Sequence, residues 1–462
     1  MLNAVYFYYD YGDLKEIPSL MEKYGVKCKL EFRKNVSQMT DNIFALNLER
    51  PFNIACYPLL QKYISMDIKI PEKHLRKIMS SFTSFMSGMQ REDGWYTATH
   101  YDYINLYQML FAFCYKFIIY EKIDVLFLVE GPHLGWDFVC AEAAKILGIK
   151  IITLVDEKEP ETRKSLIYAT NTSNPEHFYD PLTKKRDTNI IVPEKFEKKL
   201  EYMKNIVIPQ AHHLKVPFSK KILLRLLLPF NKKLIRSQRL KQYFKNLYRS
   251  YRMKVSLEAR DKYILPVDLS EKYVYFGLHL QPEGTSIING DIYCDQLLAI
   301  ERLAEMIPDD WKIYVKENPK QIGDSRGKSF YERLHCTKKA ILVPNETNTY
   351  DLMKHSQFVA SIRGTMIYEA VSGGKPAVMF GHFWFDKLPG VFKYRDSLTV
   401  DEILSCSIDH NQIQKVVNEV HEKMALGLTD RKIGLPEEKK NFNKQKNNET
   451  IINLLLEALE WK

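Results

Sequence analysis

The feature that most constrains the fold is a strand-turn-helix-strand pattern in VASIRGTMIYEAVSGGKPAVMFG, residues 359–381. An apolar run leads into a Gly-Thr turn, and a short helix then leads through Gly-Gly-Lys-Pro into a second apolar run. Two apolar runs joined in this way are typical of neighbouring parallel strands in an α/β sheet. The helix would begin at Gly364 and Thr365, so its first backbone N–H groups are available to an anion.

A carboxylate lies one turn further along the same predicted helix. Glu369 follows Thr365 by four residues, which places both on one helix face. Glu369 can accept hydrogen bonds from the two hydroxyl groups of a ribose, while Gly364 lets the backbone approach a phosphate closely. The pattern therefore indicates a phosphate- and ribose-binding unit. The alternative is an ordinary β-α-β crossover whose helix is capped by a threonine.

A second unit of the same kind lies in IDVLFLVEGPHLGWDFVCAEAAKILGIKIITLV, residues 123–155. Its branched apolar runs predict two buried parallel strands around a helix that ends at Gly148. Strand-helix alternation starts again at Tyr273, with further strands expected over 273–278, 311–316, 340–343, 358–362 and 377–380. The predicted fold class is α/β, with two Rossmann-like domains that face a cleft in a GT-B-like architecture.

The length of 462 residues favours two domains over one. We expect an N-terminal Rossmann-like domain over 1–210, a basic helical segment over 211–265, a C-terminal Rossmann-like domain over 266–435, and a tail loop with a final helix over 436–462. In open α/β sheets the ligand lies beyond the carboxyl ends of the strands. Residues at those ends are therefore the candidates for a site.

Positive charge is concentrated in residues 211–260, which contain 14 Lys and Arg residues and one acidic residue, Glu258, or about +13. The whole chain carries +10, so the remainder is near −3. Basic residues interleaved with Leu, Ile, Phe and Tyr suit an anionic membrane surface or a polyanionic substrate. The alternative is a solvated helical linker. No recognised nucleic-acid module accompanies the charge, so no nucleic-acid partner is expected.

The remaining composition argues for a cytoplasmic protein. No uninterrupted apolar stretch is long enough to span a membrane, and the first residues lack the basic region of a secretion signal. The seven cysteines are scattered singly, as reduced thiols are. Neither an Asp-x-Asp sequence nor a His/Cys cluster with ligand spacing is present, so we expect no metal site and a metal-independent reaction.

Three stretches of the sequence resemble a known family. They are YFGLHLQPEGTS (275–286), GDIYCDQLLAIERLAEMIPDDWKIYVKENP (290–319) and SIRGTMIYEAVSGGKPAVMFG (361–381). In this order they resemble the bacterial capsule polysaccharide synthesis proteins, which include the retaining β-Kdo transferases of capsule assembly. The similarity covers about 270–390 and, more weakly, 125–155.

The resemblance implies a glycosyltransferase of the GT-B type. Its donor would be a nucleotide sugar bound by the C-terminal domain, with CMP-Kdo or a related acidic sugar as the suggested donor. Its acceptor, on the side of the N-terminal domain, would be a lipid-linked or oligosaccharide precursor of a capsule or other surface polysaccharide. Such an enzyme needs no cofactor besides its substrate, and the basic segment 211–260 would place it at the inner face of the inner membrane. A non-catalytic glycan-binding component of a capsule assembly complex and a sugar-nucleotide epimerase remain alternatives.

Four residues are candidates for the chemistry. Glu130 ends a buried strand and can act as a base or nucleophile, while His133 can relay a proton or hold a phosphate. Asp137 is the alternative carboxylate, and His279 would assist the leaving phosphate from the other domain. In the purely structural interpretation, Glu130 and His133 only cap a helix and Asp137 supports the fold.

Nine residues of the C-terminal domain are candidates for nucleotide-sugar binding: Gln281, Glu283, Thr285, Lys316, Arg363, Gly364, Thr365, Glu369 and His382. Two positions depart from the family pattern. Asn318 stands where the family usually has a histidine, which removes a titratable group. Arg363 stands where the family usually has a small residue, which adds a cation beside the phosphate site.

Overall fold

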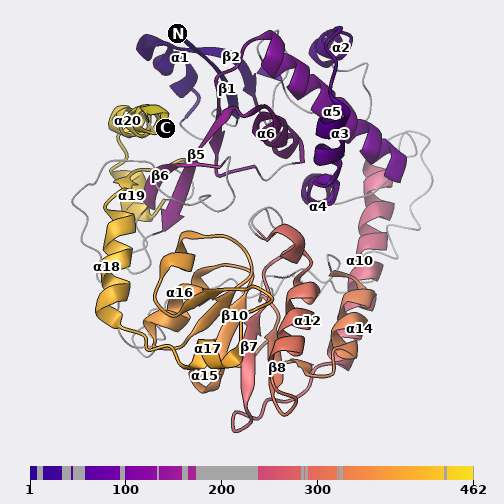
Figure 1. Cartoon of the computed structure of the whole chain (residues 1–462). Coiled ribbons are helices and arrows are strands. Elements are labelled where there is room, and N and C mark those ends of the chain that lie inside the picture. Colours follow the sequence, from indigo (N-terminus) through magenta and orange to yellow (C-terminus); the bar gives the residue numbers. More distant parts are fainter. Residues whose placement is uncertain are drawn as a thin grey trace.

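The computed structural model describes residues 1–7, 14–33, 43–44, 58–93, 99–132, 135–158, 165–172, 238–281, 286, 290–319, 321, 326–430 and 434–460. The chain forms an N-terminal lobe and a C-terminal lobe, each built around its own β-sheet (Figure 1). Both termini lie at the N-terminal lobe.

The N-terminal lobe has a sheet in the order β13-β6-β5-β4-β1-β2-β3. Its strands are β1 (Leu2–Phe7), β2 (Val26–Phe32), β3 (Ile43–Phe44), β4 (Val125–Val129), β5 (Lys150–Lys158), β6 (Ser165–Asn171) and β13 (Ala425–Leu426). The five strands from β3 to β5 are parallel, and β6 and β13 are antiparallel to their neighbours. Its helices are α1 (Ile17–Met21), α2 (Pro58–Ile64), α3 (Glu72–Met79), α4 (Phe82–Asp93), α5 (His100–Tyr120), α6 (Gly135–Leu147), α19 (Pro436–Lys440) and α20 (Lys444–Glu460).

The C-terminal lobe has a fully parallel sheet in the order β12-β11-β10-β7-β8-β9. Its strands are β7 (Tyr273–Gly277), β8 (Lys312–Lys316), β9 (Ala340–Leu342), β10 (Phe358–Ser361), β11 (Ala377–Met379) and β12 (Val391–Lys393). Its helices are α10 (Gln238–Lys262), α12 (Gln296–Met306), α14 (Lys328–Cys336), α15 (Thr349–His355), α16 (Thr365–Ser372), α17 (Val400–Leu404) and α18 (His410–His421).

The central strands of both sheets are buried on both faces. Every residue of β4 and of β10 is buried, as the continuous apolar runs predicted. Helices pack on these faces, so the cores lie between the sheets and their helices. The predicted fold class, α/β with two Rossmann-like domains, is confirmed.

One strand of the N-terminal sheet is not among the strands expected from the sequence. Residues 160–265 carry many polar side chains, yet β6 (Ser165–Asn171) pairs along its whole length with β5. Leu166 and Tyr168 of β6 are buried in the same core cluster as residues of the C-terminal lobe. Strand β6 therefore joins the cores of the two lobes, a role that its short apolar run does not reveal.

The end of the chain returns to the N-terminal lobe. Strand β13 pairs with β6, and α20 packs against β5, β6 and α1. The Lys150 ammonium donates to the Leu459 carbonyl over 3.0 Å, and the Thr429 hydroxyl donates to Asp156 over 3.1 Å. The final helix thus completes the core of the lobe that the first strand begins.

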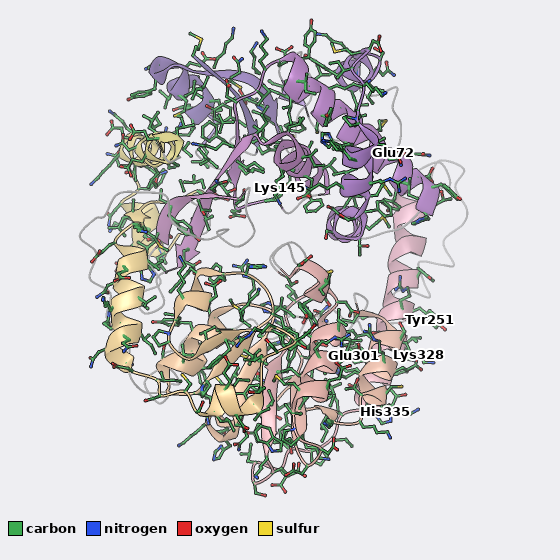
Figure 2. The ribbon with its side chains drawn as sticks, viewed as in Figure 1. Glu72, Lys145, Tyr251, Glu301, Lys328 and His335 are labelled. Carbon is green, nitrogen blue, oxygen red and sulfur yellow. The ribbon has the colours of Figure 1, made fainter. Side chains whose placement is uncertain are left out.

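Helix α10 runs along one side of the molecule from the N-terminal lobe to the C-terminal lobe (Figure 1). It packs against α14, and the ring of Tyr263, just beyond α10, stacks on His335 of α14 at 4.5 Å. Figure 2 labels Tyr251 on α10 and Lys328 and His335 on α14. Among the described residues, no helix is both long and apolar enough to cross a membrane.

Candidate active site

The strand order of the C-terminal sheet reverses between β7 and β10, because β8 and β9 lie on one side of this pair and β11 and β12 on the other. Ligands of open α/β sheets bind at such a switch point, beyond the carboxyl ends of the strands. His279 follows β7, while Arg363 and Gly364 follow β10. The structure therefore brings these three predicted site residues to the expected place.

Gly364 is the N-cap of α16, with φ of +114° and ψ of 168°. A Cβ atom there would lie 3.0 Å from His279 Cε1, so both the backbone angle and the close approach require glycine. Among the described residues, no side chain caps this end of the helix. The amino end of α16 therefore keeps its partial positive charge and its first N–H groups for a ligand. Thr365 is exposed beside it.

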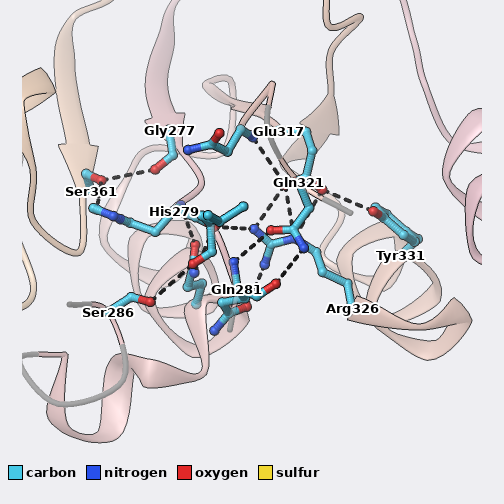
Figure 3. Close-up of polar contacts among 12 residues, drawn as sticks. Gly277, His279, Gln281, Ser286, Glu317, Gln321, Arg326, Tyr331 and Ser361 are labelled. Atoms are coloured by element: carbon cyan, nitrogen blue, oxygen red, sulfur yellow. Dashed lines mark hydrogen bonds and ion pairs between the residues drawn. The ribbon is translucent and has the colours of Figure 1, made fainter. Parts of the chain in front are cut away.

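His279 is held through its backbone and its ring. Its N–H donates to Gln296 Oε1 over 2.8 Å, and its carbonyl accepts from Arg326 over 2.5 Å (Figure 3). Its ring Nε2 accepts from the Arg363 backbone N–H over 3.1 Å and lies 3.1 Å from Ser361 Oγ. The ring thus links the end of β7 to the turn that precedes α16.

The pKa of His279 is lowered to about 4. Burial is the largest cause, followed by the positive charge of Arg363, whose backbone hydrogen bond acts in the opposite direction. The charge of Arg326 lowers the pKa further. The neutral imidazole is therefore the dominant form near pH 7.

A buried ion pair supports the loop that follows β7. Arg326 and Glu317 lie 2.9 Å apart, with side chains 0% and 2% exposed. The Tyr331 hydroxyl donates to Glu317 over 3.0 Å, and Arg326 donates to Gln281 Oε1 over 2.6 Å (Figure 3). Since Arg326 also binds the His279 carbonyl, this pair fixes both ends of the 279–281 loop.

Gln281 forms a reciprocal amide pair with Gln321. The Gln281 N–H donates to Gln321 Oε1 over 2.8 Å, and Gln321 Nε2 donates to the Gln281 carbonyl over 2.7 Å. Gln281 Nε2 also donates to the Cys294 carbonyl over 2.6 Å. Gln281, predicted to bind the nucleotide sugar, therefore uses these groups to order its own loop.

Arg363 is buried, and its guanidinium lies 4.1 Å from the centre of the Phe383 ring. A cation over an aromatic face is stabilised and loses rotational freedom. Phe383 belongs to the turn after β11, where His382 is partly exposed. Lys393 donates to the Phe380 carbonyl over 3.0 Å and to the Gly381 carbonyl, and burial lowers its pKa to about 8. This turn thus brings His382 and a fixed cation to one edge of the sheet.

A second cluster of polar side chains comes from β7, β8, α15 and α16, and its members are Tyr275, Lys316, Thr349 and Glu369. Lys316 Nζ donates to Thr349 Oγ1 over 2.8 Å, and burial lowers its pKa. Burial raises the pKa of the nearby Tyr275 hydroxyl and the Glu369 charge raises it further, while Thr349 acts in the opposite direction. Glu369 itself is half-buried in α16.

The two N-terminal carboxylates differ in exposure. Glu130 follows β4, is exposed, and has a φ of +65°. A residue other than glycine in this conformation is strained, and such strain is concentrated at functional sites. Asp137 is fully buried in the first turn of α6, where its carboxylate accepts the Phe138 N–H over 2.6 Å. Glu130 is therefore the more accessible of the two.

Three predicted residues, His133, Glu283 and Thr285, lie outside the described residues. Four supporting residues have no counterpart in the prediction: Gln296, Gln321, Arg326 and Ser361. Gln321 and Arg326 lie outside the three stretches that resemble the family, whereas Gln296 and Ser361 lie within them but have no spacing that indicates their roles. In the part of the chain that the structure describes, no group of three or more His, Cys, Asp or Glu side chains could hold a metal ion. Metal independence stays a prediction.

Comparison with known families finds one match. Residues 201–397 match the family described as capsule polysaccharide biosynthesis protein. The match confirms the predicted family resemblance over this range. It includes β7, α16 and the whole of the site at the switch point. No curated protein matches the chain.

Several solved structures are similar to this chain. UDP-GlcNAc 2-epimerase from Methanocaldococcus jannaschii, in complex with UDP-GlcNAc and UDP, is 12% identical and has a TM-score of 0.25, with coverage of 98% of this chain and 99% of that chain. KpsC, a beta Kdo 2,7 transferase from Thermosulfurimonas dismutans, is 13% identical with a TM-score of 0.26, and the coverage is 76% and 88%. A glycosyltransferase from Rickettsia africae is 10% identical with a TM-score of 0.25, and the coverage is 100% and 99%.

Replacing Gly364 by alanine should destabilise the protein, because the new Cβ combines an unfavourable φ with a contact to His279. We expect a loss of about 1–3 kcal/mol in the free energy of unfolding, measured by denaturant titration. Gly327→Ala is the matched control, because Gly327 is the N-cap of α14 with a φ of +76° and a ψ of 165° but has no atom within 4 Å of the position that the new methyl group would take. Equal losses in the two variants would show that the His279 contact has no energetic weight.

Proposed function

We propose that this chain is a glycosyltransferase that transfers a sugar from a nucleotide donor to a capsule or other surface-polysaccharide acceptor. The observation that carries the proposal is the amino end of α16 at the switch point of the C-terminal sheet, which no side chain of the described residues caps. The family match over residues 201–397 supports it, because it spans this site.

In this proposal the donor's phosphate binds the first N–H groups of α16, beside Gly364 and Thr365. Arg363 places a positive charge next to that position, held in orientation by Phe383. Glu369 lies one turn into α16, where its carboxylate can accept hydrogen bonds from the ribose hydroxyls. Charge stabilisation by the helix and by Arg363 would make a divalent cation unnecessary for leaving-group departure.

The additional cation also bears on the choice of sugar. An acidic sugar such as Kdo brings a carboxylate close to the phosphate, and the two negative charges repel each other. Arg363 can offset part of this repulsion, because it directly precedes the N-cap of α16 and its buried guanidinium is fixed against the Phe383 ring. CMP-Kdo or a related acidic donor therefore remains our proposal for the substrate.

The reaction also requires a base or nucleophile on the acceptor side, and we assign this role to Glu130. It follows β4, which lies beside β1 where the N-terminal strand order reverses. Its exposure and positive φ favour it over the buried Asp137. As a base, the Glu130 carboxylate would take the proton of the acceptor hydroxyl. As a nucleophile, it would form a bond to the anomeric carbon while the nucleotide leaves.

A panel of nucleotide sugars tests the function. Donors are first ranked by the increase in melting temperature of the full chain, and the best are incubated with capsule oligosaccharides or their lipid-linked precursors. We expect nucleotide release that depends on the acceptor, together with an elongated glycan. Isomerised donor in the absence of acceptor would indicate an epimerase. Glycan binding without turnover of any donor would indicate a non-catalytic component.

Glu130→Gln keeps the size and hydrogen-bonding groups of the side chain but removes its basicity and charge. If Glu130 is the base or nucleophile, turnover should fall by about 100-fold or more, while donor affinity stays close to that of the wild type. Glu72→Gln is a matched control at an exposed position of the same lobe and should keep full turnover. A Glu130→Gln enzyme with near-normal turnover would exclude this residue from the mechanism.

We also propose that the basic segment 211–260 holds the enzyme at the inner face of the inner membrane, where lipid-linked acceptors reside. Part of this segment lies outside the described residues. In its described part, α10 exposes Tyr248 and Tyr251, with Tyr251 64% exposed, beside the basic residues Arg252 and Lys254. Aromatic and basic side chains on one helix suit the interface of an anionic bilayer.

Vesicle sedimentation tests the membrane proposal. Each basic residue near an anionic surface contributes about 1 kcal/mol, and this attraction falls off within a Debye length. The full chain should therefore sediment with phosphatidylglycerol vesicles at low salt and be released at high salt. Equal binding to phosphatidylcholine vesicles, or none to either, would leave the segment as a solvated linker.

A further inference from the structure

The protonation state of His279 follows from one hydrogen bond. The Arg363 backbone N–H can only donate, and it points at His279 Nε2 over 3.1 Å. Nε2 is therefore an acceptor and carries no proton. A ring turned by 180° would place a carbon atom against this N–H, so the same bond also fixes the orientation of the ring.

A neutral imidazole whose Nε2 is bare carries its proton on Nδ1. The charged groups that act on this ring are the guanidinium groups of Arg363 and Arg326, both positive, and both disfavour a second proton. Among the described residues, no hydrogen-bond partner is found for Nδ1, whereas the backbone N–H, the backbone carbonyl and Nε2 of His279 are all engaged. The His279 ring is thus neutral, and its Nδ1–H can donate a hydrogen bond to a ligand.

The position of this donor is set by Gly364. A Cβ atom at Gly364 would lie 3.0 Å from His279 Cε1 and 3.5 Å from Nε2, so this edge of the ring borders the amino end of α16. Cε1 separates the two nitrogens, and Nδ1 therefore lies on the far side of Cε1 from the Arg363 contact. Only Cε1 and Nε2 of the ring lie within 4 Å of that Cβ position, so Nδ1 lies further from Gly364, beyond Cε1.

We propose that His279 binds the donor's phosphate as a neutral hydrogen-bond donor through Nδ1–H, while its Nε2 orients the Arg363–Gly364 turn. This inference rests on the proposed function, because it takes the bound anion to be a nucleotide phosphate. His279 then transfers no proton during the reaction. It contributes a fixed N–H group beside the backbone N–H groups of α16, and it keeps that role as long as the ring stays neutral.

The tautomer can be measured without any ligand. In the full chain with ¹⁵N-labelled histidine rings, the His279 signals are assigned by their loss in His279→Gln. We expect a protonated Nδ1 and an unprotonated Nε2, with no titration between about pH 6 and 8. A proton on Nε2, or a ring that titrates in this range, would overturn the inference whatever the protein's substrate is.

Two variants separate the two nitrogens. The glutamine amide reaches the position of Nε2 and can still accept from Arg363 N–H, whereas the shorter asparagine amide lies near the position of Nδ1. His279→Gln should therefore keep the turn but weaken the binding of CMP and UDP by about tenfold in calorimetry, with cytidine and uridine unaffected. His279→Asn keeps an N–H donor near the position of Nδ1. Its preference for nucleotide over nucleoside should therefore be larger than that of His279→Gln.

The outcomes distinguish this inference from the function on which it rests. If the wild-type chain binds neither nucleotide more tightly than its nucleoside, the nucleotide site fails, and the phosphate assignment of His279 fails with it. If the wild type binds nucleotides and His279→Gln binds them equally well, only the role of His279 is overturned.

Discussion

The site depends on one buried charge pair, Arg326 with Glu317. Taking two charges out of water is costly, and removing either partner would leave an uncompensated buried charge, at about 3–5 kcal/mol. Arg326 also donates to the His279 carbonyl and to Gln281, so the ion pair holds the loop after β7 in place. The ring of His279 in turn accepts the Arg363 N–H and so holds the turn before α16. The buried pair thus orders, through His279, the group of atoms proposed to meet the phosphate.

The sequence predicts those parts of the fold that depend on local patterns. Apolar runs identify β4, β7 and β10, and the Gly-Thr turn identifies the start of α16, because burial and helix initiation leave marks within a few residues. Strand β6 was missed because its apolar run is short and flanked by polar residues. Its burial comes from pairing with β5 and from packing against residues far along the chain. The return of the chain end to the N-terminal sheet through β13 is equally non-local.

The same distinction applies to the site. Gly364 and Glu369 were predictable because a turn and a helical spacing place them. Arg326 and Gln296 were not, since each acts through a contact with a loop distant in sequence. Asn318 is informative in another way: its N–H donates to Glu317 over 3.2 Å, and its side chain cannot titrate as the histidine usual in the family would. Glu130 therefore remains our candidate for proton transfer or nucleophilic attack, and Arg363 our candidate for charge stabilisation.

The central claim is that a nucleotide binds at the switch point of the C-terminal sheet. Hydrogen exchange of the full chain, with and without the nucleotide that raises its melting temperature most, tests this claim directly. Exchange should slow in residues 277–281 and 361–369 and stay unchanged in α20, because bound phosphate and ribose would engage the backbone and side chains of those segments. Slowing confined to the N-terminal lobe, or spread evenly over both lobes, would contradict the claim.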